Sequence, residues 1–392
     1  MITLQGKRNS AIVFAEKIDK ETKKKISELL SDEAFADSKI RIMPDAHSSK
    51  SAVIGTSMTL YGRVRPSLLG PDIGCGMEAV FIENREVDLE KLDAVIHESI
   101  PCGKNIRKSA IAGFDLGALY CKDAVDTDRA EKSLGTLGGG NHFIELDRCE
   151  NGGLLLVIHS GSRSLGSGVA EYYEHEAFRA MCKKERKKAR HSYYEERSEG
   201  GFEKSSRKGK STVKIVRENA VLEGKLFEQY LHDIAIVQSF AEENRMLMAD
   251  IICREMGFTA RDRFSCVHNY IDTEHMILRK GAISARQGER IIVPLNMRDG
   301  AVIGTGKGNP EWNFSAPHGA GRACARHEAK KAFTVEEYRE QMAGIYTTTA
   351  DAGSLDECPM AYKSPQKILP FLAETAEIEQ IVKPVYNFKA CE

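Results

Sequence analysis

The spacing of apolar residues along the chain predicts several helices. In Glu16–Leu30, apolar residues recur every three or four positions, which is typical of a helix with one buried face. Val87–Ile100 has the same pattern and ends before a proline, which cannot continue a helix. The longest such segment runs over about Val221–Met256, and Gly257 after it predicts the end of the helix.

Shorter apolar segments predict strands between these helices. They are Ser51–Leu60, Ala79–Ile82, Leu154–Ile158 and Arg290–Pro294. Strands and helices alternate too irregularly for a doubly wound parallel sheet, and no linker rich in proline and serine divides the chain. We therefore expect an α+β fold in which residues 1–392 form a single large domain with mixed or antiparallel sheets.

The composition restricts the class of protein. A hydrophobic content of 42% and a charged content of 29% are typical of a soluble globular chain. No apolar run approaches the roughly 20 residues of a membrane helix, and the N-terminus lacks the pattern of a signal peptide. The ten cysteines are scattered singly. We therefore expect a cytoplasmic protein with reduced thiols and no membrane partner, whose oligomeric state the sequence leaves open.

One segment is strongly basic, although the formal net charge of the chain is only -1. Residues 182–214 are rich in lysine and arginine, and their glycines and lysines predict an insertion within the domain. Two interpretations remain open. The segment is either a solvated helix and loop, as charge runs usually are, or a basic surface that attracts the phosphates of a nucleic acid.

A cysteine between two glycines marks the first candidate site. The segment SLLGPDIGCGMEAVF places Cys75 between Gly74 and Gly76 and three residues after Asp72. Glycine occurs where the backbone turns sharply or approaches another group closely. Carboxylate and thiolate are both anionic ligands, and a thiolate needs a nearby positive charge at neutral pH. We therefore expect Asp72 and Cys75 to bind a metal ion.

Four histidines share a setting, at the end of a predicted strand and beside glycine or a small residue. They are His142, His159, His268 and His318. One histidine of this kind is usually structural, but four of them together with Asp72 and Cys75 indicate a site assembled at strand ends. Imidazole, thiolate and carboxylate ligands suit Zn, Mn, Fe or Co. The remaining histidines lack this setting, and we interpret most of them as surface or packing residues. They are His47, His97, His175, His191, His232, His275 and His327.

Glycine-rich and cationic residues indicate a nucleotide. The sequences LGGGN and GTGKGN, the second at Gly304–Asn309, expose backbone N–H groups of the kind that bind phosphates. Arg163 and Arg322 can each donate two N–H groups to phosphate oxygens. Lys389 ends an apolar strand near the C-terminus, where it either reaches inward or stays on the surface.

Taken in order, these segments resemble the RtcB family of RNA ligases from about residue 40 to the C-terminus. The most specific matches are DIGCGM, GNHFIE and HGAGR. The segments HSSKSAVIG and VPLNMRDGAVIG depart from the commoner family pattern, which indicates a divergent, short bacterial-type branch. The full set of matches comprises MPDAH (43–47), DIGCGM (72–77), GTLGGGNHFIE (135–145), HSGSRSLG (159–166), VHNY (267–270), HGAGR (318–322), AYK (361–363) and KPVYNFKA (383–390).

The resemblance implies an α+β fold around a central metal cleft and a GTP-dependent RNA ligase. Such an enzyme joins an RNA 3′-phosphate or 2′,3′-cyclic phosphate end to a 5′-hydroxyl end, in RNA repair or tRNA splicing. It also implies that His318 is the nucleophile that carries GMP, and that the cleft holds two Mn²⁺ ions. The implied ligands are Asp72, Cys75 and His142 for one ion and Cys75, His159 and His268 for the other.

The same resemblance implies a pocket for GTP. Glu145 suits guanine because guanine presents adjacent N1–H and N2–H donors, a pair that adenine lacks. Asp45 belongs to a motif near the metals. The residues implied to bind the nucleotide are Asn141, His142, Phe143, Ile144, Glu145, His268, Asn269, Pro294, Leu295, Asn296, Met297, Gly319, Ala320, Gly321, Tyr362 and Lys389.

Two other functions fit parts of this pattern. A metal-dependent cyclic phosphodiesterase would use the metal ligands but neither His318 nor Glu145. An RNA-binding protein with a structural zinc would need a closed set of four ligands in near-neighbour pairs, whereas these ligands occur singly over about 200 residues. The ligase interpretation predicts RNA with broken ends, such as tRNA or rRNA fragments, as the partner.

Overall fold

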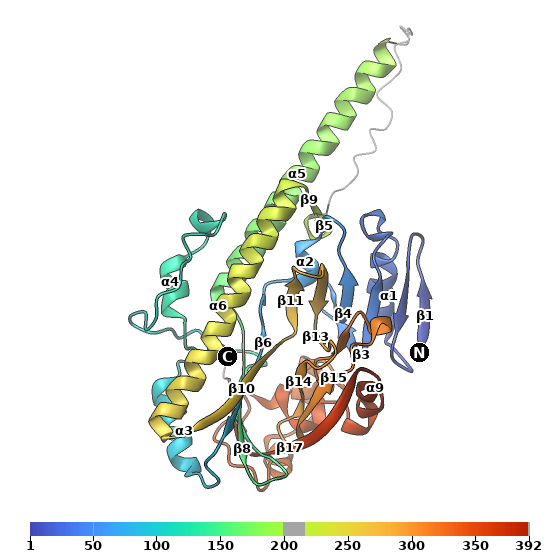
Figure 1. Ribbon diagram of the computed structural model, residues 1–392. Helices are drawn as coiled ribbons and strands as arrows, with labels where there is room; N and C mark the ends of the chain where they lie inside the picture. The colour runs from blue at the N-terminus through green and yellow to red at the C-terminus, as the bar shows by residue number, and fades with distance from the viewer. Residues whose placement is uncertain (50, 199–215, 391–392) are drawn as a thin grey trace.

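Two large β-sheets carry most of the strands in residues 1–49, 51–198 and 216–390, the part of the chain that this computed structural model describes (Figure 1). The first sheet has the strand order β1-β2-β3-β4-β12-β11. In it β2 and β3 are parallel, and the other neighbours are antiparallel. Its strands are β1 (Ile2–Gln5), β2 (Ser10–Val13), β3 (Ile40–Ser48), β4 (Val53–Thr59), β11 (Asn269–Asp272) and β12 (Ile277–Lys280).

The second sheet has the order β10-β6-β8-β7-β17-β15-β14, and all its neighbours are antiparallel. The sheet curls, so that its two outer strands, β10 and β14, approach each other. Arg290 of β14 pairs with Asp262 of β10, with 2.6 Å between Nη1 and Oδ2. The strands are β6 (Gly76–Ile82), β7 (Phe143–Arg148), β8 (Leu154–Ser160), β10 (Ala260–Val267), β14 (Arg290–Asn296), β15 (Gly300–Gly306) and β17 (Ala376–Lys389).

Helices and two short strand pairs complete the described residues. β5 (Arg63–Val64) pairs with β9 (Leu222–Glu223), and β13 (Ala282–Ser284) pairs with β16 (Ser315–Pro317). Figure 1 shows α5 projecting well beyond the two sheets. The helices are α1 (Lys20–Leu29), α2 (Pro66–Leu69), α3 (Leu89–Ser99), α4 (Thr127–Lys132), α5 (Arg163–Ser198), α6 (Lys225–Met256), α7 (Arg326–Ala332), α8 (Val335–Gln341) and α9 (Leu369–Thr375).

The two faces of the second sheet have different neighbours, because side chains alternate along each strand. Ile144 and Ile158 lie on one face and pack in a core with Ile96 of α3 and Met248 of α6. Phe143 lies on the opposite face, in a core that also contains residues of β13, β14, β15, β16 and α9. That second face is the one on which the polar residues described below gather.

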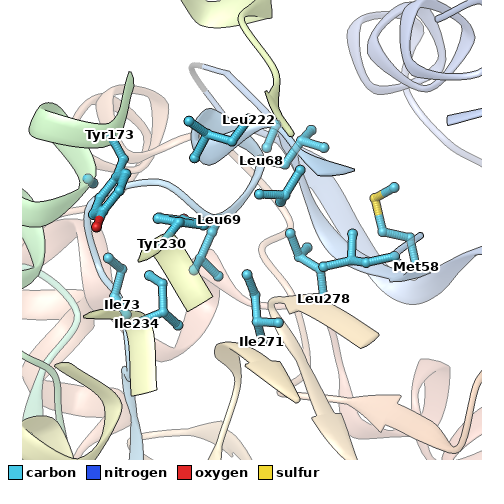
Figure 2. Close-up of a cluster of buried hydrophobic side chains, with 14 of the residues drawn as sticks. Met58, Leu68, Leu69, Ile73, Tyr173, Leu222, Tyr230, Ile234, Ile271 and Leu278 are labelled. Carbon is cyan, nitrogen blue, oxygen red and sulfur yellow. The ribbon is translucent and has the colours of Figure 1, made fainter. Parts of the chain in front are cut away.

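Helix α6 connects the cores of the two sheets. Figure 2 shows Tyr230 and Ile234 of α6 in one cluster with Ile271 and Leu278 of the first sheet. The last turns of the same helix contribute Ile252 and its neighbours to the core of the second sheet. One helix therefore fixes the position of one sheet relative to the other.

A small separate core holds the single tryptophan of the chain. Trp312 stacks on Phe14, and the two ring centroids are 3.5 Å apart. Met43 and Ala282 complete this core. Because Phe14 follows β2 and Trp312 precedes β16, the stack joins the first sheet to the β13–β16 pair.

The predicted α+β class is confirmed, and the predicted helices are present as α1, α3 and α6. Gly257 ends α6 in the left-handed conformation, with a φ of 68°. The helix begins at Lys225 rather than Val221, because Leu222–Glu223 pairs with β5 instead. Three of the four predicted strands lie within β6, β8 and β14, and the fourth, Ser51–Leu60, contains β4 and extends beyond it at both ends.

The basic segment is described only in part. Residues 182–198 continue α5, whereas residues 199–214 of the predicted insertion lie outside the described residues. The extent of the single domain stays a prediction. Among the described residues, no helix combines the length and the hydropathy that crossing a membrane requires.

Candidate active site

A cavity of about 290 Å³ lies at the end of the second sheet where β6 and β7 begin and β8, β10 and β17 end. Residues of the first sheet and of the C-terminal region also line it, so segments far apart in the sequence meet there. The predicted site residues in its lining are Asp72, Asn141, Phe143, Glu145, His159, His268, Asn269, Pro294, Leu295, Asn296, Met297, His318, Gly319, Ala320, Gly321, Tyr362 and Lys389.

The loop around Cys75 requires its two glycines because it is packed tightly. Gly74 has a φ of 74°, and a Cβ there would lie 2.7 Å from the Cβ of Ala241 on α6. A Cβ at Gly76 would lie 2.6 Å from the backbone oxygen of Cys266 on β10. The glycines therefore allow the fully buried Cys75 to lie between α6 and β10.

The five predicted metal ligands form two groups that share Cys75. The Sγ atom of Cys75 lies 3.2 Å from Nε2 of His159 and 3.5 Å from Nε2 of His142. Nε2 of His159 is 3.4 Å from Nε2 of His268. The ligand atoms of Cys75, His159 and His268 lie within 4.8 Å of one another, and so do those of Asp72, Cys75 and His142. The predicted division of the ligands matches this arrangement.

Hydrogen bonds to the backbone orient two of the imidazoles. Nδ1 of His142 is 2.8 Å from the carbonyl oxygen of Leu137, and Nδ1 of His159 is 3.2 Å from that of Asn141. In both rings Nδ1 donates to a carbonyl, which leaves the lone pair of Nε2 directed at the thiol. This is the usual way in which a protein orients a histidine that binds a metal.

The electrostatics of the cluster suit a cation. Burial, followed by the neighbouring histidines, lowers the pKa of His159 and His268 well below the usual value, so both rings are neutral and able to bind a metal. Burial and then Asp72 raise the pKa of the Cys75 thiol. A bound cation would supply the positive charge that a thiolate needs. One sulfur, three imidazoles and one carboxylate fit a borderline transition metal.

Two residues of α6 hold the segments that carry these ligands. Arg245 is fully buried, and its Nη1 donates to the carbonyl oxygens of Gly74 at 2.8 Å and Ser160 at 3.1 Å. Asn244 accepts from the N–H of Thr136 at 3.0 Å and donates to the carbonyl of Gly161 at 3.1 Å. Sequence reasoning missed both residues, because on a long helix they look like ordinary polar positions.

His318 lies beside the metal cluster and contacts a buried carboxylate. Its ring centroid is 5.0 Å from that of His268. Nδ1 of His318 is 2.6 Å from Oδ2 of Asp45, which is fully buried, whereas 20% of the His318 side chain is exposed. The contact fixes which ring nitrogen faces Asp45 and leaves Nε2 for another partner.

The alternation along β7 separates three residues predicted to bind the nucleotide. Phe143 and Glu145 line the cavity, whereas the side chain of Ile144 points to the other face and packs in the core with α6. The side chain of Ile144 therefore does not line the cavity, and a contact of this residue with the nucleotide stays a prediction. Oε2 of Glu145 accepts a hydrogen bond of 2.6 Å from Nδ2 of Asn387 on β17. Burial raises the pKa of Glu145 to about 7.

Lys389 reaches inward, and only 4% of it is exposed. Its Nζ donates to the carbonyl of Asn141 at 3.0 Å, pairs with Oε2 of Glu357 at 2.9 Å, and lies 5.1 Å from the ring centroid of Phe143. Of the two positions that the sequence left open for Lys389, the interior one is present.

Glu357 is a buried carboxylate that the sequence did not indicate. Besides Lys389 it contacts Nη1 of Arg322 at 3.2 Å and Nη1 of Arg326 at 2.5 Å, and it accepts a hydrogen bond from the hydroxyl of Tyr362. Its neighbours Arg322, Arg326, Tyr362 and Lys389 all line the cavity. Through these ion pairs and this hydrogen bond, Glu357 holds the four residues of one cavity wall together.

Two groups that the sequence indicated as phosphate-binding lie outside the lining of the cavity. Arg163 does not line the cavity, because its guanidinium donates to the carbonyl of Gly103 at 2.7 Å and to Thr136 Oγ1 at 3.1 Å. Gly304–Asn309 lies in β15 and the loop after it, and also does not line the cavity. His47, one of the seven histidines outside the strand-end setting, lines the cavity, and its place in MPDAH was the available signal.

Comparison with known proteins matches this chain to one family along most of its length. The family described as "tRNA-splicing ligase RtcB" matches residues 30–123 and 116–390. The chain is 30% identical to the RNA-splicing ligase RtcB of Escherichia coli K12, over 89% of this chain and 90% of the relative. It is 26% identical to RNA-splicing ligase RtcB2 of Escherichia coli ATCC 25922, over 88% of this chain and 86% of the relative. It is 23% identical to the tRNA-splicing ligase RtcB of Aeropyrum pernix, over 83% of this chain and 82% of the relative.

Proposed function

The chain belongs to the RtcB family, and from this premise we propose that it is a GTP-dependent ligase that joins RNA 3′-phosphate or 2′,3′-cyclic phosphate ends to 5′-hydroxyl ends. The observation that carries the proposal is the position of His318. Its ring lies 5.0 Å from that of His268, between a cluster of metal-binding side chains and a cavity of nucleotide size. A cyclic phosphodiesterase would have no use for a nucleophile there.

His318 attacks the α-phosphate of GTP through Nε2, because Nδ1 faces Asp45. The N–P bond forms as the bond to the β-phosphate breaks, and pyrophosphate leaves. The RNA 3′-phosphate then displaces the histidine from GMP, and the 5′-hydroxyl of the second RNA displaces GMP. Asp45 stabilises the imidazolium that forms on attack and keeps the ring in the required orientation.

The groups Asp72, Cys75, His142 and Cys75, His159, His268 would hold two Mn²⁺ ions. When bound, such ions neutralise charge on the phosphates. Zinc binds cysteine and histidine more tightly than manganese, so manganese must prevail through availability and geometry. We expect ligation to be faster with Mn²⁺ than with Zn²⁺ or Mg²⁺, and equal rates with all three would contradict the assignment of the ion.

The cavity wall formed by β7 and β17 binds guanine. Glu145 accepts from the N1–H and N2–H of the base, and Phe143, Tyr362 and Lys389 surround it. The loop Pro294–Met297 and the turn Gly319–Gly321 contribute further contacts to the nucleotide, together with Asn141 and Asn269. The buried Lys389 adds a positive charge on the side of the cavity where the base lies.

Covalent labelling tests the proposal. The protein is incubated with GTP labelled at the α-phosphate, and we expect an acid-labile label that is lost in His318→Ala and kept in His327→Ala, which changes an exposed histidine outside the cavity. A second assay ligates RNA with a 2′,3′-cyclic phosphate to RNA with a 5′-hydroxyl. Opening of the cyclic phosphate with neither label nor ligation would support the phosphodiesterase instead.

Asp45→Asn tests the contact to the nucleophile. The substitution keeps the shape of the side chain but removes the negative charge 2.6 Å from Nδ1 of His318. We expect labelling by GTP to slow by about 100-fold or more. The melting temperature and the affinity for Mn²⁺ should stay close to those of the wild type. Unchanged labelling would exclude this role for Asp45.

The projecting helix α5 binds RNA outside the cavity. Lys183, Lys184, Arg186, Lys187 and Lys188 are all exposed on it, where they are free to meet phosphates, although a solvated helix would expose them as well. Reversing two of these charges, in Lys183→Glu with Lys187→Glu, should weaken RNA binding and reduce its dependence on salt. The control reverses Lys23 and Lys24, which are exposed on α1. Equal effects of the two double variants would contradict the proposal.

Broken tRNA or rRNA is the substrate class that this chemistry serves, in RNA repair or tRNA splicing, and the cytoplasm is the compartment. The proposal also treats residues 1–392 as a single ligase domain. The packing of α6 against the cores of both sheets supports it.

A further inference from the structure

Two buried carboxyl groups lie in contact behind the wall of the cavity. Glu145 and Asp147 are two residues apart on β7, so both side chains point to the same face of the sheet. Glu145 is 3% exposed and Asp147 is fully buried. The two carboxyl groups are within hydrogen-bonding contact of each other. No N–H or O–H group of another described residue donates to either carboxyl oxygen of Asp147.

Two ionised carboxylates in contact and away from water would repel each other strongly, so such a pair retains a proton. The surrounding groups indicate which residue carries it. Glu145 receives a hydrogen bond from Asn387 and faces Lys389, whereas the cation near Asp147 is Lys383, whose Nζ donates instead to the carbonyl of Asp299 at 3.0 Å. The remaining titratable neighbour of Asp147 is the thiol of Cys149. The proton therefore belongs to Asp147.

Glu145 and Asn387 line the cavity, and Asp147 does not. Asp147 can act on a ligand only through Glu145. We propose that Asp147 is a positioning residue of the nucleobase pocket, a neutral acid whose O–H donates to Glu145 and keeps that carboxylate ionised and oriented toward the N1–H and N2–H of guanine. The inference rests on the proposed function, because it requires a base with that donor pair in the cavity.

The shared proton makes the pocket sensitive to pH on both sides. Burial raises the pKa of Glu145 to about 7, and burial together with Glu145 raises that of Asp147. Toward acid pH a second proton neutralises Glu145, and the N–H donors of guanine lose a charged acceptor. Toward alkaline pH the shared proton leaves, and repulsion between the two carboxylates displaces Glu145. The pair binds guanine best when it holds one proton.

Two substitutions that keep the branching of the side chain at Cγ separate this role from simple packing. Asp147→Asn supplies an amide N–H that donates to Glu145 at every pH. Asp147→Leu fills the space but donates nothing. Position 147 lies outside the lining of the cavity and is not among the metal-ligating groups, so neither substitution removes a group from either site. A packing role predicts that the two variants lose the same affinity, with no dependence on pH.

The test measures GTP binding to the Mn²⁺-loaded wild type and to both variants from pH 6 to 9. The ratio of affinities at each pH cancels titration of the metal ligands, which all three proteins share. We expect Asp147→Asn to match the wild type within about twofold at pH 7 and to bind about tenfold more tightly than it at pH 9. Asp147→Leu should bind about tenfold more weakly than the wild type at pH 7.

The inference would be overturned if the ratio of the GTP affinity of Asp147→Asn to that of the wild type stayed constant with pH. Equal losses of GTP affinity in the two variants would overturn it as well. Inosine triphosphate, which lacks the N2 amino group, should show a smaller loss in Asp147→Leu than GTP does. A wild type that does not bind GTP at all would sink the proposed function. If the wild type binds GTP but the ratios of variant to wild-type affinity do not change with pH, only the role of Asp147 is excluded.

Discussion

The carboxylate of Glu357 stays ionised in a position where burial opposes its charge. Burial alone would raise its pKa, but Lys389, Arg326, Tyr362 and Arg322 together lower it to about 2. The carboxylate is costly to remove, because the buried Lys389 would lose the ion pair with Glu357 that compensates its charge. Glu357 thus stabilises the wall of the cavity and the inward position of Lys389 at the same time.

Glu357→Gln should therefore destabilise the protein at neutral pH and change how its stability depends on pH. A carboxyl group whose pKa is lowered on folding stabilises the folded state above its unfolded pKa, and that contribution disappears as the pH falls toward 2. A shift from 4.5 to about 2 corresponds to roughly 3 kcal/mol of unfolding free energy at pH 7. Urea unfolding of both proteins at pH 7, 4 and 3 measures it.

The difference between wild type and Glu357→Gln should shrink from pH 4 to pH 3. Glu340→Gln, which changes an exposed carboxylate on α8, serves as the control and should leave the unfolding free energy within about 0.5 kcal/mol of the wild type. A difference that stays the same at the three pH values would show that packing, and not charge, accounts for the effect.

Among the elements, α6 holds the backbone segments that carry the metal-binding residues. It packs against the cores of both sheets, and its residues Asn244 and Arg245 bond to the backbone of all three segments around Cys75, His142 and His159. Ligands that come singly from loops and strand ends are thereby held by one rigid helix. The arrangement explains how a site spread over the chain can be fixed in shape before any ion binds.

Asn244→Ala removes four of these hydrogen bonds and leaves the N–H of Thr136 without its acceptor. We expect a loss of roughly 3 kcal/mol of unfolding free energy and an affinity for Mn²⁺ that is weaker by about tenfold or more. Calorimetric titration of Mn²⁺ and urea unfolding measure the two effects. Glu242→Ala, at an exposed position of the same helix, is the control. A variant that loses stability but keeps the affinity of the wild type would show that α6 does not position the ligands.

At the scale of the whole molecule, the metal cluster joins parts of the chain from residue 72 to residue 268. Ions that bind only the folded state stabilise it, by about 2.7 kcal/mol when their concentration is 100 times the dissociation constant. Mn²⁺ should therefore raise the melting temperature of the wild type and of His318→Ala, but not that of Cys75→Ser, which alters the ligand common to both groups. The same rise in Cys75→Ser would contradict a shared sulfur.

Local patterns predicted much of this molecule, because they depend on neighbours in sequence. The end of α6 at Gly257 and the strand-end position of the four histidines are of this kind. The opposite direction of the Ile144 side chain also follows from strand alternation. Residue types and spacing indicated the metal-binding residues, whereas their division between two ions and the cavity residues came from the family resemblance, which carries information about long-range contacts.

Contacts between distant segments with no such motif could not be predicted. Glu357 meets Lys389 only because the C-terminal strand β17 ends at the cavity, and Asn244 meets Thr136 only because α6 crosses below the second sheet. The strand orders of the two sheets also depend on contacts between distant segments, so they could not be predicted either. They arise from packing free energy summed over many residues, which no single segment expresses.

The stack of Trp312 on Phe14 gives the protein an internal optical reporter. Because the chain has one indole, all of its tryptophan emission comes from the small core that precedes His318 by six residues. Separation of the N-terminal sheet from the strand leading to the nucleophile would expose that indole to water and shift its emission to longer wavelength. Tryptophan fluorescence can therefore follow this one contact without any added label.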